Sequence, residues 1–161
     1  MRQTKKAYAV ALPVEGEGKR GEDGHLGYLL RQAAAAHRLR MDRVLTDLGV
    51  TPAQFSVLTM LVAYPGQSNA DIARLALLTP PTVTVIVGNL EGMRAISRRP
   101  HAVHGRIQHI DVTASGKALL ARCRERVQVL ETGLDAGLSA DGAQLIRRWL
   151  AGVTQEISSV Q

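Results

Sequence analysis

Apolar side chains recur every three or four residues near the start of the sequence, which is the spacing of one helical face. The stripe predicts a long helix from about residue 25 to residue 48. Its members are Leu26, Leu30, Ala33, His37, Met41, Val44 and Leu48. Asp23 stands where a capping residue is expected, and Gly49 stands where the helix should end.

A second and a third helix are predicted on similar grounds. Thr51-Pro52-Ala53-Gln54 has the form of a capping box, and Tyr64-Pro65-Gly66 ends the helix that follows it. Packing residues for this helix are Phe55, Leu58, Leu61 and Val62. Ser68 then precedes Asp71 by three residues, which predicts a capped short helix with an apolar face of Ile72, Leu75 and Ala76.

The fourth predicted helix begins at Thr79-Pro80, because proline in the first turn gives up only an N–H that has no partner. Val83, Ile86, Val87 and Leu90 recur at helical spacing and predict the buried side. The residues left facing outward are Pro81, Thr82, Thr84, Val85, Gly88 and Asn89. Such small side chains can approach base edges closely, and Val85 can contact a thymine methyl group.

A basic stretch follows this helix. Residues 92–110 contain four arginines and no acid, and they are typical of a hairpin with a basic tip. Helix, turn, helix and basic hairpin together indicate a winged helix-turn-helix, with Arg98 and Arg99 placed for phosphate contact. The fold class is therefore mainly α with a small β-hairpin wing.

Two further helices are predicted over residues 113–158. The first carries Gly116, Leu120, Cys123, Val127, Leu130 and Leu134, and the second carries Leu145, Ile146, Trp149, Val153 and Ile157. We call the winged helix-turn-helix of about residues 51–112 the reading unit. One reading unit is too small to bury the apolar faces of these two helices and of helix 25–48 as well. The surplus apolar surface indicates a homodimer, and a two-fold pair of reading units suits a pseudo-palindromic DNA site.

The bulk properties agree with this interpretation. The 161 residues suit one domain, 25–161, preceded by a flexible arm over residues 1–24 whose Arg2, Lys5 and Lys6 are expected to be solvated. A net charge of +6 favours a polyanionic partner. A single cysteine fits a reducing cytoplasm, and the sequence has neither a run long enough for a membrane span nor a convincing signal peptide.

Candidate chemistry is sparse. His101, His104 and His109 do not predict a metal site, because alternation along a hairpin scatters them over two faces. Cys123 lies on an apolar stripe, where thiols are usually inert, although three neighbouring arginines leave a redox switch as an alternative. His37 is either a core or interface histidine or a ligand-pocket residue. No catalytic constellation and no cofactor site stands out, so we expect no enzyme.

The order of these elements resembles the MarR family of bacterial transcriptional regulators over roughly residues 25–155. The residues that carry the resemblance are Thr51-Pro52-Ala53-Gln54-Phe55, Asn69-Ala70-Asp71-Ile72-Ala73, Thr82-Val83-Thr84, Val87, Leu90-Glu91, Val112-Thr113 and Gly116-Lys117. The resemblance implies a homodimer with interwoven terminal helices, a recognition helix in each major groove and a wing in the flanking minor groove. It also implies a repressor that a small aromatic or phenolic effector releases from DNA.

The sequence departs from the family pattern in the wing and beside it. His104-Gly105-Arg106 matches the wing tip only through Arg106, since an acid is common where His104 stands. Arg94 takes the place of a glycine that often ends the recognition helix, and Val85 and Asn89 stand where basic residues are usual.

The residues we expect to bind DNA are Ser68, Asn69, Pro81, Thr82, Thr84, Val85, Asn89, Arg98, Arg99 and Arg106. Those expected to bind an effector are His37, Arg40, Phe55 and Cys123, and their common placement rests on the family resemblance. Two alternative functions remain at this point, a cysteine-based redox-sensing regulator and a winged-helix module for protein–protein interaction.

Overall fold

The computed structural model describes the backbone of residues 14–100 and 108–158 and the side chains of these ranges as far as residue 155. The chain divides into two units, residues 1–40 and 41–161. Helix α1 (Leu26–Leu45) runs across this division. The predicted wing tip, with His101, His104 and Arg106, lies outside the described residues, as do Arg2, Lys5 and Lys6.

The first unit contains a 3-10 turn, η1 (Gly18–Arg20), and most of α1. The helix begins three residues after Asp23, so the prediction that Asp23 caps it is wrong. The carbonyl oxygen of His25 instead accepts the first helical hydrogen bond, from Leu29 N at 3.0 Å. Of the predicted stripe in this unit, Leu26 is 68% exposed and Ala33 is exposed, while Leu30 and His37 are half-buried.

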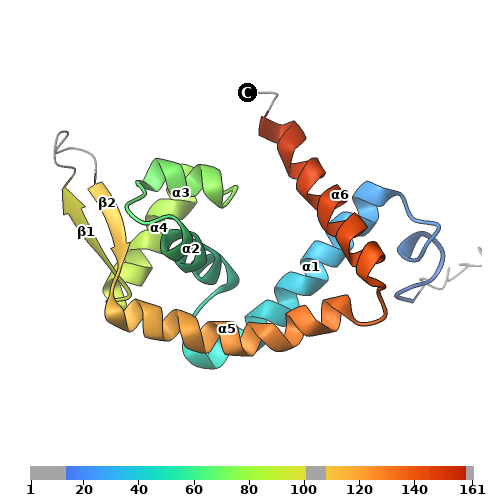
Figure 1. Cartoon of the computed structure of the whole chain (residues 1–161), viewed down its shortest axis with the longest axis horizontal. Helices are drawn as coiled ribbons and strands as arrows, with labels where there is room; N and C mark the ends of the chain where they lie inside the picture. The colour runs from blue at the N-terminus through green and yellow to red at the C-terminus, as the bar shows by residue number, and fades with distance from the viewer. Residues whose placement is uncertain (1–13, 101–107, 159–161) are drawn as a thin grey trace, which may run out of the picture. The chain divides into compact units, whose positions relative to one another are not determined.

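The second unit holds the predicted winged helix-turn-helix in the expected order. After the 3-10 turn η2 (Thr46–Leu48) come α2 (Pro52–Ala63), α3 (Asn69–Leu75), α4 (Pro80–Gly92), β1 (Ile96–Pro100), β2 (Gln108–Val112), α5 (Ala114–Asp135) and α6 (Ala140–Ser158). The hairpin starts and finishes beside the first turn of α5 (Figure 1). We call α4 the recognition helix and the β1–β2 hairpin the wing.

Most of the predicted helix starts are confirmed by their caps. Thr51 and Gln54 form a reciprocal capping box, and Ser68 and Asp71 form another. Thr79 caps α4 and Thr113 caps α5 through their side-chain oxygens. Because each cap satisfies backbone N–H groups that the helix leaves unpaired, the sequence pattern was sufficient to locate these ends.

Two apolar clusters hold the second unit together. The first gathers the buried sides of α2, α3, α4, the wing base and α5: Val57, Leu58, Leu61, Ile72, Ala73, Val83, Ile86, Val87, Leu90, Ala95, Ile96, Ile110 and Leu120. The second joins the end of α1 to α5 through Met41, Leu45, Val50, Cys123 and Val127. Phe55 packs against both clusters.

Within α3 the predicted apolar face is partly wrong. Ile72 is buried as expected, but Leu75 is 41% exposed and Ala73 is buried in its place. Steps of one, three and four residues place Ile72, Ala73 and the half-buried Ala76 on one side of the helix, and Leu75 lies outside that side. A stripe extended to its last residue therefore overestimates the buried face.

The wing is a two-stranded antiparallel sheet in which Arg98 lies opposite Ile110 and Arg99 lies opposite His109. One further contact was not predicted. Gln67, in the loop before α3, forms an isolated antiparallel bridge with Ile110, whose N–H donates to the Gln67 carbonyl at 3.0 Å. This bridge fixes the base of the wing to the start of α3.

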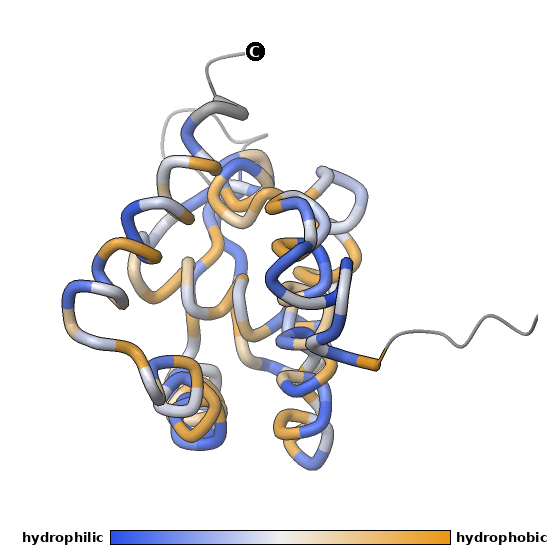
Figure 2. The backbone as a smooth tube through the Cα atoms, turned by 90° about the vertical axis from the view of Figure 1, so that its right-hand side faces the viewer, coloured by the Kyte–Doolittle hydropathy of each residue, from blue (hydrophilic) through white to orange (hydrophobic). Residues whose placement is uncertain are grey.

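Bands of hydrophobic and hydrophilic residues alternate along the helical turns (Figure 2). No single described helix is long and apolar enough to span a membrane. Two pairs of consecutive helices, Leu26–Leu48 with Pro52–Ala63 and Asn69–Leu75 with Pro80–Gly92, have that length and composition when taken together, but each pair is sharply bent. Beyond Val127 the apolar side chains of α5, α6 and their connection are largely exposed: Val129, Leu134, Leu138, Leu145, Ile146, Trp149 and Leu150. The described part of one chain therefore leaves these apolar side chains exposed, in keeping with the surplus apolar surface that the sequence predicted.

Candidate nucleic-acid interface

The recognition helix separates its two faces as the periodicity predicts. Val83, Ile86, Val87 and Leu90 are at most 6% exposed. All six residues predicted to face outward are exposed: Pro81, Thr82, Thr84, Val85, Gly88 and Asn89. Val85 is 63% exposed and lies near the centre of this outward face, since steps of three and four residues lead from it to Pro81, Gly88 and Asn89.

The hydroxyl groups on this face are used within the helix. Thr84 Oγ1 donates to the carbonyl oxygen of Pro80 at 3.0 Å, and the Thr79 and Thr82 hydroxyls share a hydrogen bond at 2.7 Å. Pro80 and Pro81 have no N–H, and the Thr82 N–H donates to Thr79 Oγ1. The first turn of α4 therefore offers apolar rings where many helices offer free N–H groups to an anion.

The two predicted wing arginines point to opposite faces of the hairpin, because they are adjacent in one strand. Arg98 shares its face with buried Ile96 and Ile110, and its Nε donates to Glu91 Oε2 at 3.0 Å. Arg99 lies on the other face and forms an ion pair with Asp111. Both guanidinium groups are thus held by a carboxylate of the reading unit.

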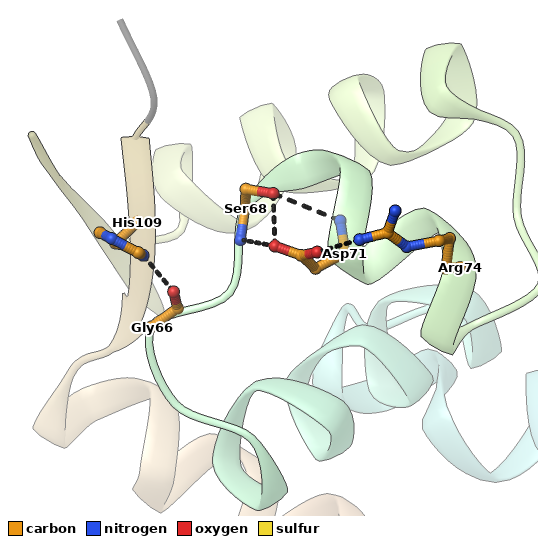
Figure 3. Close-up of polar contacts among 5 residues, drawn as sticks. All are labelled: Gly66, Ser68, Asp71, Arg74 and His109. Atoms are coloured by element: carbon orange, nitrogen blue, oxygen red, sulfur yellow. Dashed lines mark hydrogen bonds and ion pairs between the residues drawn. The ribbon is translucent and has the colours of Figure 1, made fainter. Parts of the chain in front are cut away.

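The contacts around the start of α3 form a second polar group (Figure 3). Ser68 Oγ donates to Asp71 Oδ2 at 2.6 Å, Ser68 N donates to the same oxygen at 3.1 Å, and Asp71 also pairs with Arg74. The hydrogen bonds from Ser68 hold the pKa of the Asp71 carboxyl below its ordinary value, with a smaller contribution from Arg74. The Ser68 hydroxyl proton is committed to the cap, and Asn69 beside it is half-buried.

His109 makes a contact that the sequence did not suggest. Its Nδ1 contacts the carbonyl oxygen of Gly66 (Figure 3). Gly66 lies in the loop between α2 and α3. Gly66 has a φ of +76°, a conformation that favours glycine. Together with the Gln67–Ile110 bridge, this contact joins the wing to the helix-turn-helix at two adjacent residues.

The turn that ends α4 resembles a glycine C-cap but contains an arginine. Arg94 has a φ of +57°; its N–H donates to the Glu91 carbonyl, and the Ala95 N–H donates to the Leu90 carbonyl, both at 2.9 Å. These are the two hydrogen bonds of a Schellman motif. The departure seen in the sequence is therefore accommodated, at the cost of a strained arginine backbone.

This turn is joined directly to α5. Thr113 Oγ1 donates to the Arg94 carbonyl at 2.7 Å, and Ser115 Oγ donates to the same oxygen at 2.8 Å. A side chain at Gly116 would place its Cβ 1.9 Å from the Ala95 carbonyl oxygen. Close packing at Gly116 and two hydroxyl donors thus attach α5 to the end of the recognition helix.

The predicted effector residues are divided between the two units. Cys123 belongs to the second apolar cluster, and Phe55 packs against that cluster. His37 and Arg40 belong to the first unit, where Arg40 is exposed. His37 is half-buried, and its Nδ1 is buried without a hydrogen-bond partner among the described residues.

Cys123 is fully buried. Burial raises the pKa of its thiol, and the nearby Arg122 opposes that rise only in part. Since the thiolate is the reactive form, this environment is typical of an inert structural cysteine. Within the ranges that the structure describes, no three His, Cys, Asp or Glu side chains group as metal ligands would.

The chain is similar in sequence to known transcriptional regulators. Residues 48–107 match the MarR family model. HTH-type transcriptional repressor Rv2887 of Mycobacterium tuberculosis is 33% identical over 129 residues, which cover 80% of this chain and 93% of the relative.

Two solved structures show the same fold. The transcriptional repressor CouR bound to a 23-mer DNA duplex superposes with a TM-score of 0.77 at 27% identity, covering 86% of this chain and 98% of CouR. Rv2887 in complex with p-aminosalicylic acid superposes with a TM-score of 0.65 at 31% identity, covering 81% of this chain and 98% of that one. The capped helix-turn-helix, its wing and these likenesses lead to one assignment: the chain belongs to the MarR family of transcriptional regulators.

Proposed function

We propose that this protein is a homodimeric, sequence-specific DNA-binding repressor without a catalytic step. The observation that carries the proposal is the recognition helix, which buries one complete face and exposes an uncharged face of small residues. The CouR–DNA complex and the repressor Rv2887 support it by likeness. The exposed apolar residues of α5 and α6 support a second copy, which would place two reading units on a two-fold DNA site.

We assign DNA contact to the outward face of α4, to Asn69 at the start of α3, and to the wing arginines. The assignment to Ser68 is narrower than the sequence implied. Its hydroxyl proton and its N–H both go to Asp71, and its hydroxyl oxygen accepts the Asp71 N–H, so only the second lone pair of that oxygen remains for a contact. Arg98 and Arg99 would reach phosphates as members of ion pairs with Glu91 and Asp111.

The test is a titration of labelled duplexes selected from a random pool by the full-length protein. Specific binding should persist in excess nonspecific DNA, and the logarithm of the affinity should fall linearly and steeply with the logarithm of salt concentration. A winged helix that serves as a protein platform would enrich no sequence. Sedimentation should show a dimer at micromolar protein, and a monomer would contradict the two-fold arrangement.

We also propose that a small aromatic acid lowers the DNA affinity. The complex of Rv2887 with p-aminosalicylic acid supports this by likeness. In this chain, Phe55 offers an aromatic surface against the second cluster, and His37 carries a buried ring nitrogen in need of a hydrogen bond. Arg40 offers a positive charge, and Cys123 contributes apolar volume rather than a redox centre.

Aromatic carboxylates screened by thermal shift, followed by DNA titration with each hit, test this second proposal. A tenfold fall in DNA affinity requires about 1.4 kcal/mol of coupling between the two ligands. His37→Ala and Phe55→Leu should each weaken the hit and its effect on DNA. A hit that both variants bind unchanged would remove these two residues from the site.

A further inference from the structure

The outward face of the recognition helix presents methyl and methylene groups almost throughout. Val85 contributes two methyl groups, and Pro80 and Pro81 contribute exposed rings. Thr84 and Thr82 have committed their hydroxyls to Pro80 and Thr79, so their methyl groups are the parts left without partners. No lysine, arginine or glutamine lies on this helix, and its one acid, Glu91, pairs with Arg98.

The polar readers of guanine are therefore missing from this face. Guanine is read in the major groove by the bidentate donors of arginine or lysine, and cytosine by a carboxylate acceptor. Asn89 is the one exposed amide on the helix, and asparagine pairs with the N6 and N7 atoms of adenine. The apolar group that the major groove offers is the thymine C5-methyl.

Gly88 leaves the outward face of the helix without a side chain beside Val85. It lies one turn after Val85, within an α-helix, where glycine is unfavourable relative to alanine. A Cβ added at Gly88 would meet no atom within 4 Å, so the fold itself does not require glycine there. An approaching DNA surface would require it, because a side chain at this position would hold the helix away from the groove floor.

We infer that this recognition helix reads A·T base pairs through their thymine methyl groups, with Asn89 on adenine, and that Gly88 lets the helix reach them. The inference rests on the proposed DNA-binding function and specifies the operator chemistry. Each half-site should contain a short run of A·T pairs where α4 enters the major groove. Guanine and cytosine at those positions should be rejected because the helix leaves their polar edges unpaired.

The test uses the full-length protein and a half-site pair selected from random duplexes. Each thymine in the selected core is replaced by deoxyuridine, which lacks only the C5-methyl group. We expect about a fourfold loss of affinity for each contacted methyl. Replacement by 7-deazaguanine of any guanine that the selected duplex carries beside this run should have little effect.

Two variants separate methyl contact from general damage. Val85→Ala removes both γ-methyl groups and keeps a good helix former, and it should abolish the sensitivity to deoxyuridine at one position. Thr84→Val keeps a methyl and removes a hydroxyl that already bonds within the helix, so it should retain that sensitivity. Gly88→Ala should raise the denaturation midpoint and weaken DNA binding, whereas Gly133→Ala, in open space on α5, should leave DNA binding unchanged.

The outcomes distinguish this inference from the function on which it rests. If no duplex is enriched, the DNA-binding function itself is overturned. If an operator is enriched but deoxyuridine is neutral and 7-deazaguanine is costly, DNA binding stands and thymine-methyl reading is overturned. A Gly88→Ala variant that binds the operator as tightly as the wild type would overturn the close approach at Gly88.

Discussion

The recognition helix and the wing present different chemistry at their surfaces. The outward face of α4 carries no uncompensated charge and is lined by methyl groups and one amide. The described part of the wing carries two arginines, each of which pairs with a carboxylate. Under the proposed function, we expect charge-dependent affinity to come mainly from the wing and sequence preference mainly from the helix.

The acids beside the wing arginines hold the guanidinium groups in position, and they also reduce the net positive charge of the wing. Glu91 belongs to the last turn of α4, so its pairing with Arg98 links the two surfaces. Asp111 holds Arg99 on the opposite face of the hairpin. These pairs are partly exposed and contribute little to stability, but they limit the directions in which each guanidinium can reach a phosphate.

The largest expected effect is on the wing. Arg99→Ala combined with Arg106→Ala should lower DNA affinity by roughly tenfold or more and reduce the slope of log affinity against log salt by about two, one for each phosphate contact. The loss should be similar for all sequences. The control is Arg124→Ala with Arg126→Ala on α5, which removes the same charge; equal losses in the two double variants would show that net charge alone governs binding.

The next effect is on the helix. Asn89→Ala should cost about 1–3 kcal/mol at one adenine position and relax the preference there. The salt slope should remain that of the wild type, since no positive charge is removed. Titration against operators varied at each core position, repeated at several salt concentrations, measures both quantities, and an equal loss of affinity for all sequences would place Asn89 on the backbone instead.

A smaller effect is expected on the stability of the fold that carries both surfaces, through the cap of α3. Asp71→Asn should lower the free energy of unfolding by about 1 kcal/mol near neutral pH, because it weakens the capping box. The pKa of Asp71 is lowered in the folded state, so its stabilising effect is complete above the unfolded pKa near 4 and is lost as pH falls through the folded value.

Urea denaturation of the wild type and of Asp71→Asn between pH 7 and pH 2.5 measures this effect. The two curves should converge at the acid end. Asp141→Asn, at an exposed acid in the first turn of α6, is the matched control. A difference between wild type and Asp71→Asn that persists at the lowest pH would mean that the carboxylate charge does not carry the effect.

The smallest effect concerns the turn between the two surfaces. Arg94→Gly should stabilise the protein by up to about 1 kcal/mol, because glycine adopts a φ near +57° without strain. DNA affinity should hardly change, since Arg94 precedes the end of the wing that lies beside α5. Arg94→Ala, which keeps the strain and removes the charge, is the control; a shared loss of affinity in both variants would assign Arg94 to the DNA contact.

The local elements could be predicted from the sequence because their signals are short-range. Capping residues such as Thr51, Ser68 and Thr113 act on N–H groups two or three positions away, so their patterns identify helix starts. The two faces of α4 follow from its period, which is why the outward residues were identified correctly. Asp23 was misassigned because a capping residue in sequence does not fix which backbone turn begins the helix.

Only the tertiary structure revealed the contacts that connect distant segments. Periodicity contains no information on which carboxylate meets Arg98 or Arg99, or that His109 lies against Gly66. Nor does it show that the Thr113 and Ser115 hydroxyls donate to the Arg94 carbonyl, or that the missing side chain of Gly116 makes room for the Ala95 carbonyl. Sequence determined the elements and their faces through local hydrogen bonding and helical period, whereas long-range packing decided which of the exposed groups remain available to a ligand.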